Sequence, residues 1–262
     1  IVGVRGTLYL PRWDTVDQRV SLGLETRDYL NDCSIAGLPP GACGSAGASV
    51  SLQPLSLAYT AQTGGDIRVG ASVSLHHNLG LGGSHTRQAD FEAVRAGAKR
   101  RYTLLRGSGQ VSLPVPDWGT LALRLSAQAS GQPLVPGELF GVGGAQSVRG
   151  YEERELAGDS GLQASFEFTS PNLTGKLADT LPSLKDAELR ALVFADGGYV
   201  SSLQGAPCLP GQTRCHMASL GAGLRLAVQQ AQVRLDVGVA LTDATTTAKG
   251  DTRVHLGLIV NF

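Results

Sequence analysis

The sequence has few aromatic residues, no long apolar stretch and no excess of charge. Aromatic side chains make up 5% of the 262 residues, and the mean hydropathy is +0.01. A membrane-spanning helix needs about 20 consecutive apolar residues, and no uncharged stretch approaches that length, so a helical membrane protein is excluded. The 22 basic residues balance the 22 acidic ones. Since no basic run is interleaved with aromatics, the composition gives no reason to expect a nucleic-acid partner.

The chain begins with Ile1 rather than Met and lacks the charged and apolar regions of a signal peptide, so we expect a processed chain or a fragment. Its opening "IVGV" and the "GDSG" at 158–161 are similar to motifs of chymotrypsin-like proteases. Catalysis there needs a histidine base and a buried aspartate beside the serine. Ser160 is followed by Gly161 and Leu162, which breaks the protease pattern, and none of the five histidines lies in the expected context. We therefore expect no catalytic residues and no enzyme.

A two-residue period dominates the rest of the chain. In 119–131, apolar residues alternate with polar ones, which predicts a strand with one apolar and one wet face. The charged residues inside such segments fall on the polar face. The pattern predicts about eleven strands, at 1–11, 17–31, 47–61, 65–78, 101–115, 119–131, 161–170, 187–200, 216–229, 231–243 and 252–262.

One segment departs from this alternation. Within 47–61, Val50 and Leu52 are out of phase with Leu55 and Leu57. One extra residue in a strand would restore the phase, so we expect a β-bulge near Pro54.

The strands favour a membrane barrel over a soluble antiparallel sandwich, which would also alternate. Many run to 10 or more residues, whereas soluble strands usually have about five or six and a tilted membrane strand about 9 to 11. Short and long connections alternate, as in outer-membrane barrels, except for a long link at 170–187. The chain ends at Phe262, in phase with the apolar face of the last strand. We predict an all-β fold, a transmembrane antiparallel β-barrel.

The block "GGAQSVRGYEERELAGDSG" (143–161), together with "RRYTLLRG", "FEF", "LVFADGG" and the terminal Phe, resembles the C-terminal part of two-partner-secretion transporters. These are the haemolysin secretion/activation proteins of the Omp85 superfamily. The resemblance implies that 1–262 holds about eleven of an expected sixteen barrel strands. It also implies that the first strands and the upstream periplasmic POTRA domains are absent. The sheet would then have two open edges, which lipid does not tolerate.

The resemblance also implies a site. In this family a long loop carrying an Arg-Gly pair folds into the barrel lumen, and here the pore-loop motif matches Val148, Arg149, Gly150 and Tyr151. Arg149 is expected to meet the aspartate of a strand motif that matches Phe194, Asp196 and Gly198. A loop that re-enters a pore needs glycines for close backbone approach and a charged anchor with a partner. Glu167, in the wet phase of its strand, could brace Arg149.

The four cysteines form two local pairs in predicted extracellular loops, Cys33 with Cys43 and Cys208 with Cys215. Disulfides formed in the oxidising periplasm are the simple interpretation. The alternative is a metal site, because His216 follows Cys215, but no second Cys/His cluster has zinc-like spacing. We expect two disulfides and no metal or other cofactor.

Together these features predict a conduit that moves a secreted exoprotein client, of the haemolysin or adhesin type, across the outer membrane of a Gram-negative bacterium. Its other partners would be outer-membrane lipid and the barrel-assembly machinery, which would recognise the C-terminal strand ending at Phe262. Two alternatives stay open: a barrel-assembly insertase with the same loop motif, and a passive porin.

Overall fold

The computed structural model describes residues 1–31, 33, 43–174, 187–204 and 206–261. Within them, eleven strands pair in chain order to form one antiparallel sheet. They are β1 (Val2–Trp13), β2 (Val16–Tyr29), β4 (Pro54–Thr63), β5 (Arg68–Asn78), β6 (Thr103–Val115), β7 (Gly119–Ser130), β10 (Ser160–Thr169), β11 (Ala187–Ser201), β12 (Arg214–Val228), β13 (Ala231–Ala240) and β14 (Thr252–Val260). A short strand, β3 (Val50–Leu52), also pairs with β2. The strands predicted from the two-residue period are confirmed, with ends that differ by a few residues.

The register gives the sheet an outer and an inner face. Leu22 lies opposite Leu57, which lies opposite Leu75, which lies opposite Leu105. All four side chains are between 46% and 55% exposed, so they belong to an unbroken apolar outer face. Such a belt is what contact with lipid hydrocarbon requires. The inner face carries the alternate residues, which are mostly Ser, Gly, Gln and charged side chains.

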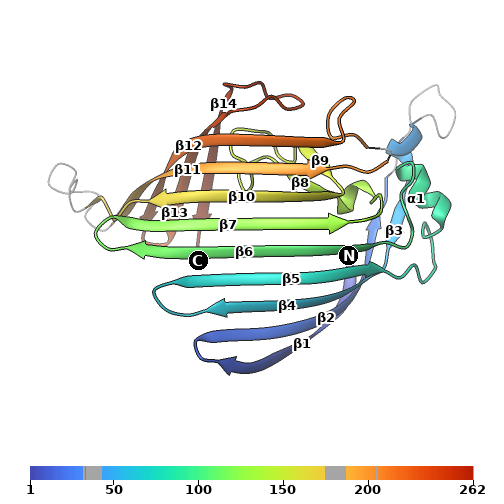
Figure 1. Ribbon diagram of the computed structural model, residues 1–262, viewed down its shortest axis with the longest axis horizontal. Helices are drawn as coiled ribbons and strands as arrows, with labels where there is room; N and C mark the ends of the chain where they lie inside the picture. The colour runs from blue at the N-terminus through green and yellow to red at the C-terminus, as the bar shows by residue number, and fades with distance from the viewer. Residues whose placement is uncertain (32, 34–42, 175–186, 205, 262) are drawn as a thin grey trace.

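The connections sort by length to the two ends of the sheet. Short turns at 14–15, 64–67, 116–118 and 229–230 lie at one end, and longer connections lie at the other, where β3 and α1 (Gln88–Val94) are found (Figure 1). The link at 170–186 is the long exception at the short-turn end, as the sequence predicts. In the part of the chain that the structure describes, β1 and β14 each pair on one side alone, so the sheet has the two open edges that were expected. Among the described residues, no helix has the length and apolar character needed to cross a membrane.

The bulge expected near Pro54 is wrong. Arg27 faces Leu52 and Leu24 faces Leu55, so three steps along one strand match three steps along the other, and the register does not slip. Val50 and Leu52 are out of phase because they point to the inner face. There they pack with Phe91, Leu104, Leu134 and their neighbours in a buried apolar cluster under the long connections.

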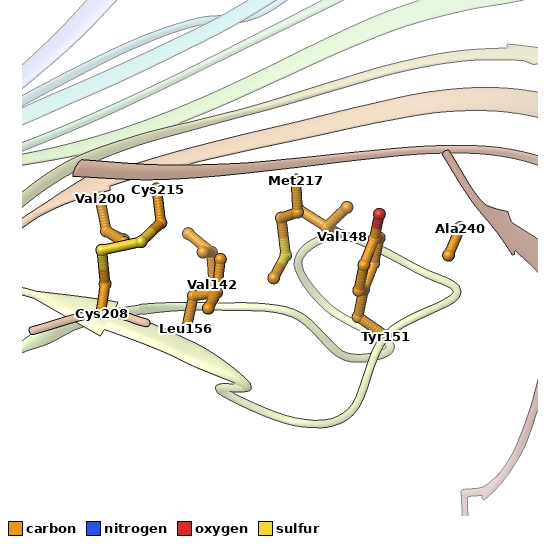
Figure 2. Packing of buried hydrophobic residues seen from close by; sticks show 9 residues of the cluster. All are labelled: Val142, Val148, Tyr151, Leu156, Val200, Cys208, Cys215, Met217 and Ala240. Carbon is orange, nitrogen blue, oxygen red and sulfur yellow. A yellow bond between two sulfur atoms is a disulfide. The ribbon is translucent and has the colours of Figure 1, made fainter. Parts of the chain in front are cut away.

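The connection between β7 and β10, residues 131–159, is defined here as the inner loop because it packs on the inner face of the sheet. It contains a 3-10 turn, η2 (Pro136–Glu138), and a small hairpin of β8 (Phe140–Val142) and β9 (Leu156–Gly158). The hairpin contacts β10 and β11. A second apolar cluster forms between this loop and β11, β12 and β13 (Figure 2), and it fixes the loop against the wall.

Candidate functional site

Glycines let the backbone of the inner loop approach the sheet. Gly150 has φ +104°, a conformation that side chains with a Cβ rarely adopt. A Cβ on Gly238 of β13 would lie 2.7 Å from the carbonyl carbon of Arg149 and 2.7 Å from the amide nitrogen of Gly150. On β11, a Cβ on Gly198 would lie 3.0 Å from Cβ of Val142. The loop therefore packs directly against the backbone of β11 and β13 at these two glycines, where no side chain intervenes.

Arg149 of the inner loop forms a bidentate ion pair with Asp196 of β11. Its Nε donates to Oδ2 over 2.8 Å and its Nη2 donates to Oδ1 over 2.9 Å. The backbone N–H of Arg149 donates a third hydrogen bond to the same carboxylate, at 3.1 Å. The side chains of Arg149 and Asp196 are 4% and 0% exposed. Charge-assisted forked pairs of this kind are among the stronger protein hydrogen bonds, so Asp196 fixes both the backbone and the side chain of the loop.

Further groups surround the Arg149 guanidinium, including the carboxylate of Asp236, which lies 3.6 Å from its Nη1. Its Nη1 donates to Oε2 of Glu167 at 3.0 Å, and its Nη2 donates to Oγ of Ser165 at 3.3 Å. The Phe194 ring lies below it, with the guanidinium carbon 3.4 Å from the ring centroid. An arginine above an aromatic face gains a cation–π attraction, which is larger away from water. Because carboxylates, a hydroxyl and a ring all face one cation, the pocket specifies arginine rather than lysine.

The residues beside Arg149 anchor the loop by packing. Val148 and Tyr151 are buried, and Figure 2 shows them meeting Met217 of β12 between the loop and the sheet. The Tyr151 hydroxyl accepts a hydrogen bond from the N–H of Thr242 at 3.1 Å and lies 2.8 Å from the carbonyl oxygen of Ala218. The Tyr151 ring therefore packs in the apolar cluster while its hydroxyl forms hydrogen bonds with the backbone at Ala218 and Thr242.

A family model described as haemolysin secretion/activation protein ShlB/FhaC/HecB matches residues 46–226. The chain belongs to this family. Searches of curated protein sequences found no match.

Solved structures show the same fold. CdiB from Escherichia coli matches with a TM-score of 0.75 and 19% identity, over 99% of this chain and 45% of that one. BamA from Haemophilus ducreyi, in a crystal structure lacking POTRA domains 1–3, matches with a TM-score of 0.65 and 16% identity, over 99% of this chain and 54% of that one. The chain thus spans about half the length of the structures it matches. It has the fold of an Omp85-type β-barrel transporter, as the sequence predicts.

This family member has a second attachment of its inner loop, which the sequence did not reveal. Glu138 of the loop is buried, and its carboxylate accepts from Nη1 of Arg27 at 2.8 Å and from Nη2 of Arg106 at 2.9 Å. The two arginines project from β2 and β6 on the inner face. Here the loop supplies the anion and the wall supplies the cations, the reverse of the arrangement at Arg149.

A third attachment uses the aspartate of "GDSG". Asp159 is fully buried and accepts a forked pair from Arg95, at 2.7 and 2.8 Å. Its two oxygens also accept from the N–H groups of Leu134 and Leu203, each at 2.7 Å. The motif that resembles a protease nucleophile therefore joins three connections at one end of the sheet. The signal available in the sequence was a charged residue in a glycine-rich turn.

Glu155 holds the inner loop to the connection between β13 and β14. Its carboxylate accepts from the Thr247 hydroxyl at 2.6 Å and from the N–H groups of Thr246 and Thr247, each at 2.8 Å. Burial alone would raise the pKa of Glu155, but these hydrogen bonds lower it to about 2.

The predicted disulfides are confirmed, Cys33 with Cys43 and Cys208 with Cys215. The second packs in the apolar cluster beneath the inner loop (Figure 2), so it also stabilises that loop. Cysteines joined in this way are not thiolate ligands, which argues against the metal alternative at His216. Phe262 lies outside the described residues.

Proposed function

We propose that the chain is part of an outer-membrane conduit that secretes a large exoprotein of the haemolysin or adhesin type. Family membership supports a transporter, and the single observation that carries the finer proposal is the inner loop, fixed on the wet face of the sheet by the buried pair of Arg149 and Asp196. We propose that Val148, Arg149, Gly150 and Tyr151 form a pore-loop motif whose anchor is Asp196 with Glu167, Phe194 and Gly198 around it.

The path of the client runs beside the inner loop, along the inner face of β4, β5, β6 and β7. This part of the wall is lined by small polar residues that face each other across strands, such as Ser72, Ser108 and Ser126. Two hollows of about 440 and 340 Å³ lie there. Small hydroxyl side chains form weak hydrogen bonds with any peptide, which suits an unfolded chain that must move on.

The apolar outer face supports a location in the outer membrane of a Gram-negative bacterium, in contact with lipid. Completion of the wall needs further strands, because open edges are not stable in lipid. We propose that the full-length protein supplies them, with periplasmic POTRA domains before them, and that barrel-assembly machinery inserts it through the C-terminal strand. An epitope tag at Gly211 should then be labelled on intact cells, whereas a tag at Asp117 should not. Equal labelling of both would contradict this orientation.

Deletion of the gene tests the secreted client. We expect one or a few large proteins to disappear from the culture medium, and the wild-type gene to restore them. Loss of many outer-membrane barrels instead would indicate an insertase. Slower uptake of small solutes with an unchanged secreted fraction would indicate a porin. Either result would overturn the proposed function.

A further inference from the structure

A cavity of about 390 Å³ opens on the inner face, beside the inner loop, and arginines dominate its charged lining. Five of its lining residues are arginines: Arg124, Arg149, Arg190, Arg225 and Arg234. They outnumber the three carboxylates of the same lining, Glu167, Glu188 and Asp236. This space is called the arginine cavity below.

The arginine cavity contains a row of like charges at matched positions on three strands. Arg190 of β11 lies directly opposite Arg225 of β12, which lies directly opposite Arg234 of β13. Like charges directly opposed across strands destabilise a sheet. No other two like charges lie directly opposite each other in the strand pairs that the structure describes; Ser72, for example, lies opposite Ser108. A sequence that breaks such a local rule commonly does so at a functional position.

The carboxylates of the lining are already engaged. Asp236 accepts both of its short hydrogen bonds from Nη2 of Arg225, at 2.9 and 3.0 Å, and Glu167 accepts from Arg149 at 3.0 Å. These pairs hold Arg225 and Arg149 in place as part of the wall. The third carboxylate, Glu188, accepts from Nε of Arg190 at 2.7 Å, and Glu167 also lies 3.4 Å from Nη2 of Arg124. Arg124 and Arg190 nevertheless stay 53% and 37% exposed, and Arg234 is exposed, so their guanidinium groups can meet a ligand.

The cavity lies toward the short-turn end of the sheet. Arg225 and Arg234 are on the two strands joined by the turn at 229–230, and Arg190 is near the start of β11. In the orientation proposed above, this is the periplasmic end. Arg124 of β7 lines both this cavity and the hollow of about 340 Å³ on β4 to β7, so the cavity adjoins the proposed path of the client.

We propose that the arginine cavity binds carboxylate side chains of an extended polypeptide as it enters the conduit. The guanidinium fork matches a carboxylate in two parallel hydrogen bonds, and a hollow with an excess of one sign of charge concentrates ligands of the other sign. The inference rests on the proposed function only for the identity of the occupant, which would be an acidic segment of the client.

Peptide binding to the purified full-length gene product in neutral detergent tests this. The probe is a Glu-Ser repeat peptide carrying an uncharged dye, with a Gln-Ser repeat of equal length as its neutral counterpart, and the readout is fluorescence anisotropy. We expect the acidic peptide to bind and the neutral one to bind at least about tenfold more weakly, with the difference shrinking at high salt.

The decisive variant is Arg190→Gln with Arg234→Gln, because it leaves the pair of Arg225 and Asp236 intact. It removes the partner of Glu188, whose side chain is 47% exposed and therefore stays hydrated. Its dissociation constant for the acidic peptide should rise about tenfold or more. The matched control is Arg68→Gln, which removes an inner-face arginine of β5 that does not line the cavity, and it should change the constant less than about twofold. If the glutamine variant does not fold, Arg190→Lys with Arg234→Lys keeps the charge, removes the fork and should weaken binding to a smaller extent.

Equal affinity of the wild type for both peptides, or equal loss in the Arg68 control and the cavity variant, would overturn the inference. Since the measurement needs no client, its outcome is separate from that of the secretion test. Binding of the acidic peptide without secretion of any client would support the arginine cavity as a binding site and refute the proposed function. Secretion of a client without binding of the acidic peptide would refute the binding site alone.

Discussion

Replacement of Arg149 by alanine should release the inner loop from the sheet while the strands stay paired. The substitution removes the two forked hydrogen bonds to Asp196 and the bond to Glu167, and it takes the cation from above Phe194. The backbone N–H that also binds Asp196 remains. The main energetic effect is that a carboxylate that is 0% exposed in the side chain loses its counter-charge.

Breaking a buried pair by removing one partner costs about 3–5 kcal/mol. Water in the lumen can reach Asp196 once the guanidinium is gone, so the lower end of that range is the better estimate for the loop. At about 1.4 kcal/mol for each factor of ten, 3 kcal/mol shifts the equilibrium between docked and released loop about a hundredfold. Arg149→Lys should fall between the wild type and Arg149→Ala, because an ammonium keeps the charge without the fork.

The loop position can be read by cleavage with a glutamate-specific protease, since Glu152 and Glu153 are exposed loop residues. Arg149→Ala should be cut there much faster than the wild type at equal barrel abundance, and client export should fall. The control is Arg154→Ala, in the same loop, whose side chain is exposed and donates to one carbonyl oxygen; it should change stability by less than about 0.5 kcal/mol. Wild-type cleavage and wild-type export by Arg149→Ala would refute the anchor.

Three further substitutions probe the same loop. Gly238→Ala should mimic Arg149→Ala in the cleavage assay, because the new methyl group would collide with the loop backbone, and unchanged cleavage would contradict the close approach. Cys208→Ser with Cys215→Ser should lower stability by up to about 2.5 kcal/mol and lower the melting temperature, whereas an unchanged melting curve would show that the disulfide constrains little. The pKa of Glu155 is lowered from 4.5 to about 2, so its anchoring should be complete above pH 4.5 and lost as the pH falls toward 2. Glu155→Gln should remove that pH dependence of protease cleavage in 243–250; a variant that still shows it would rule Glu155 out.

Much of the sheet could be predicted from the sequence because one side of every strand is apolar. Alternation fixes which residues share a face, and the short turns fix which strands are neighbours. The phase of β11 put Asp196 on the wet face, and the resemblance to secretion transporters supplied Arg149 as its partner. The first step uses the pattern within one strand, whereas the second depends on the resemblance, because no pattern within either segment links Arg149 to Asp196.

The other attachments could not be predicted because their partners are far apart in the chain and the loop has no period. Glu138 meets Arg27, more than a hundred residues before it, and Asp159 meets Arg95 of a different connection. A charged residue in an irregular loop gives no sign of where its side chain goes. The prediction of a bulge near Pro54 was wrong for a different reason. A period of two assumes that the apolar face is the outer face, but under the long connections, where Val50 and Leu52 lie, the inner face is apolar as well.

The attachments of the inner loop bear on how a conduit of this kind opens. Withdrawal of the whole loop would break the pairs of Glu138, Arg149 and Asp159 and expose the apolar cluster around Tyr151 and Met217. The separated charges would regain water, but each large apolar side chain exposed costs about 1.5–3 kcal/mol, and several are buried in this cluster. The loop is attached to β6 and β7 through Arg106 and Gln128, but among the described residues no hydrogen bond joins it to β4 or β5, and hollows already lie along this side of the wall. Local movement that widens this side therefore requires far less free energy than removal of the loop. The energetics favour a path for the client beside an inner loop that stays anchored.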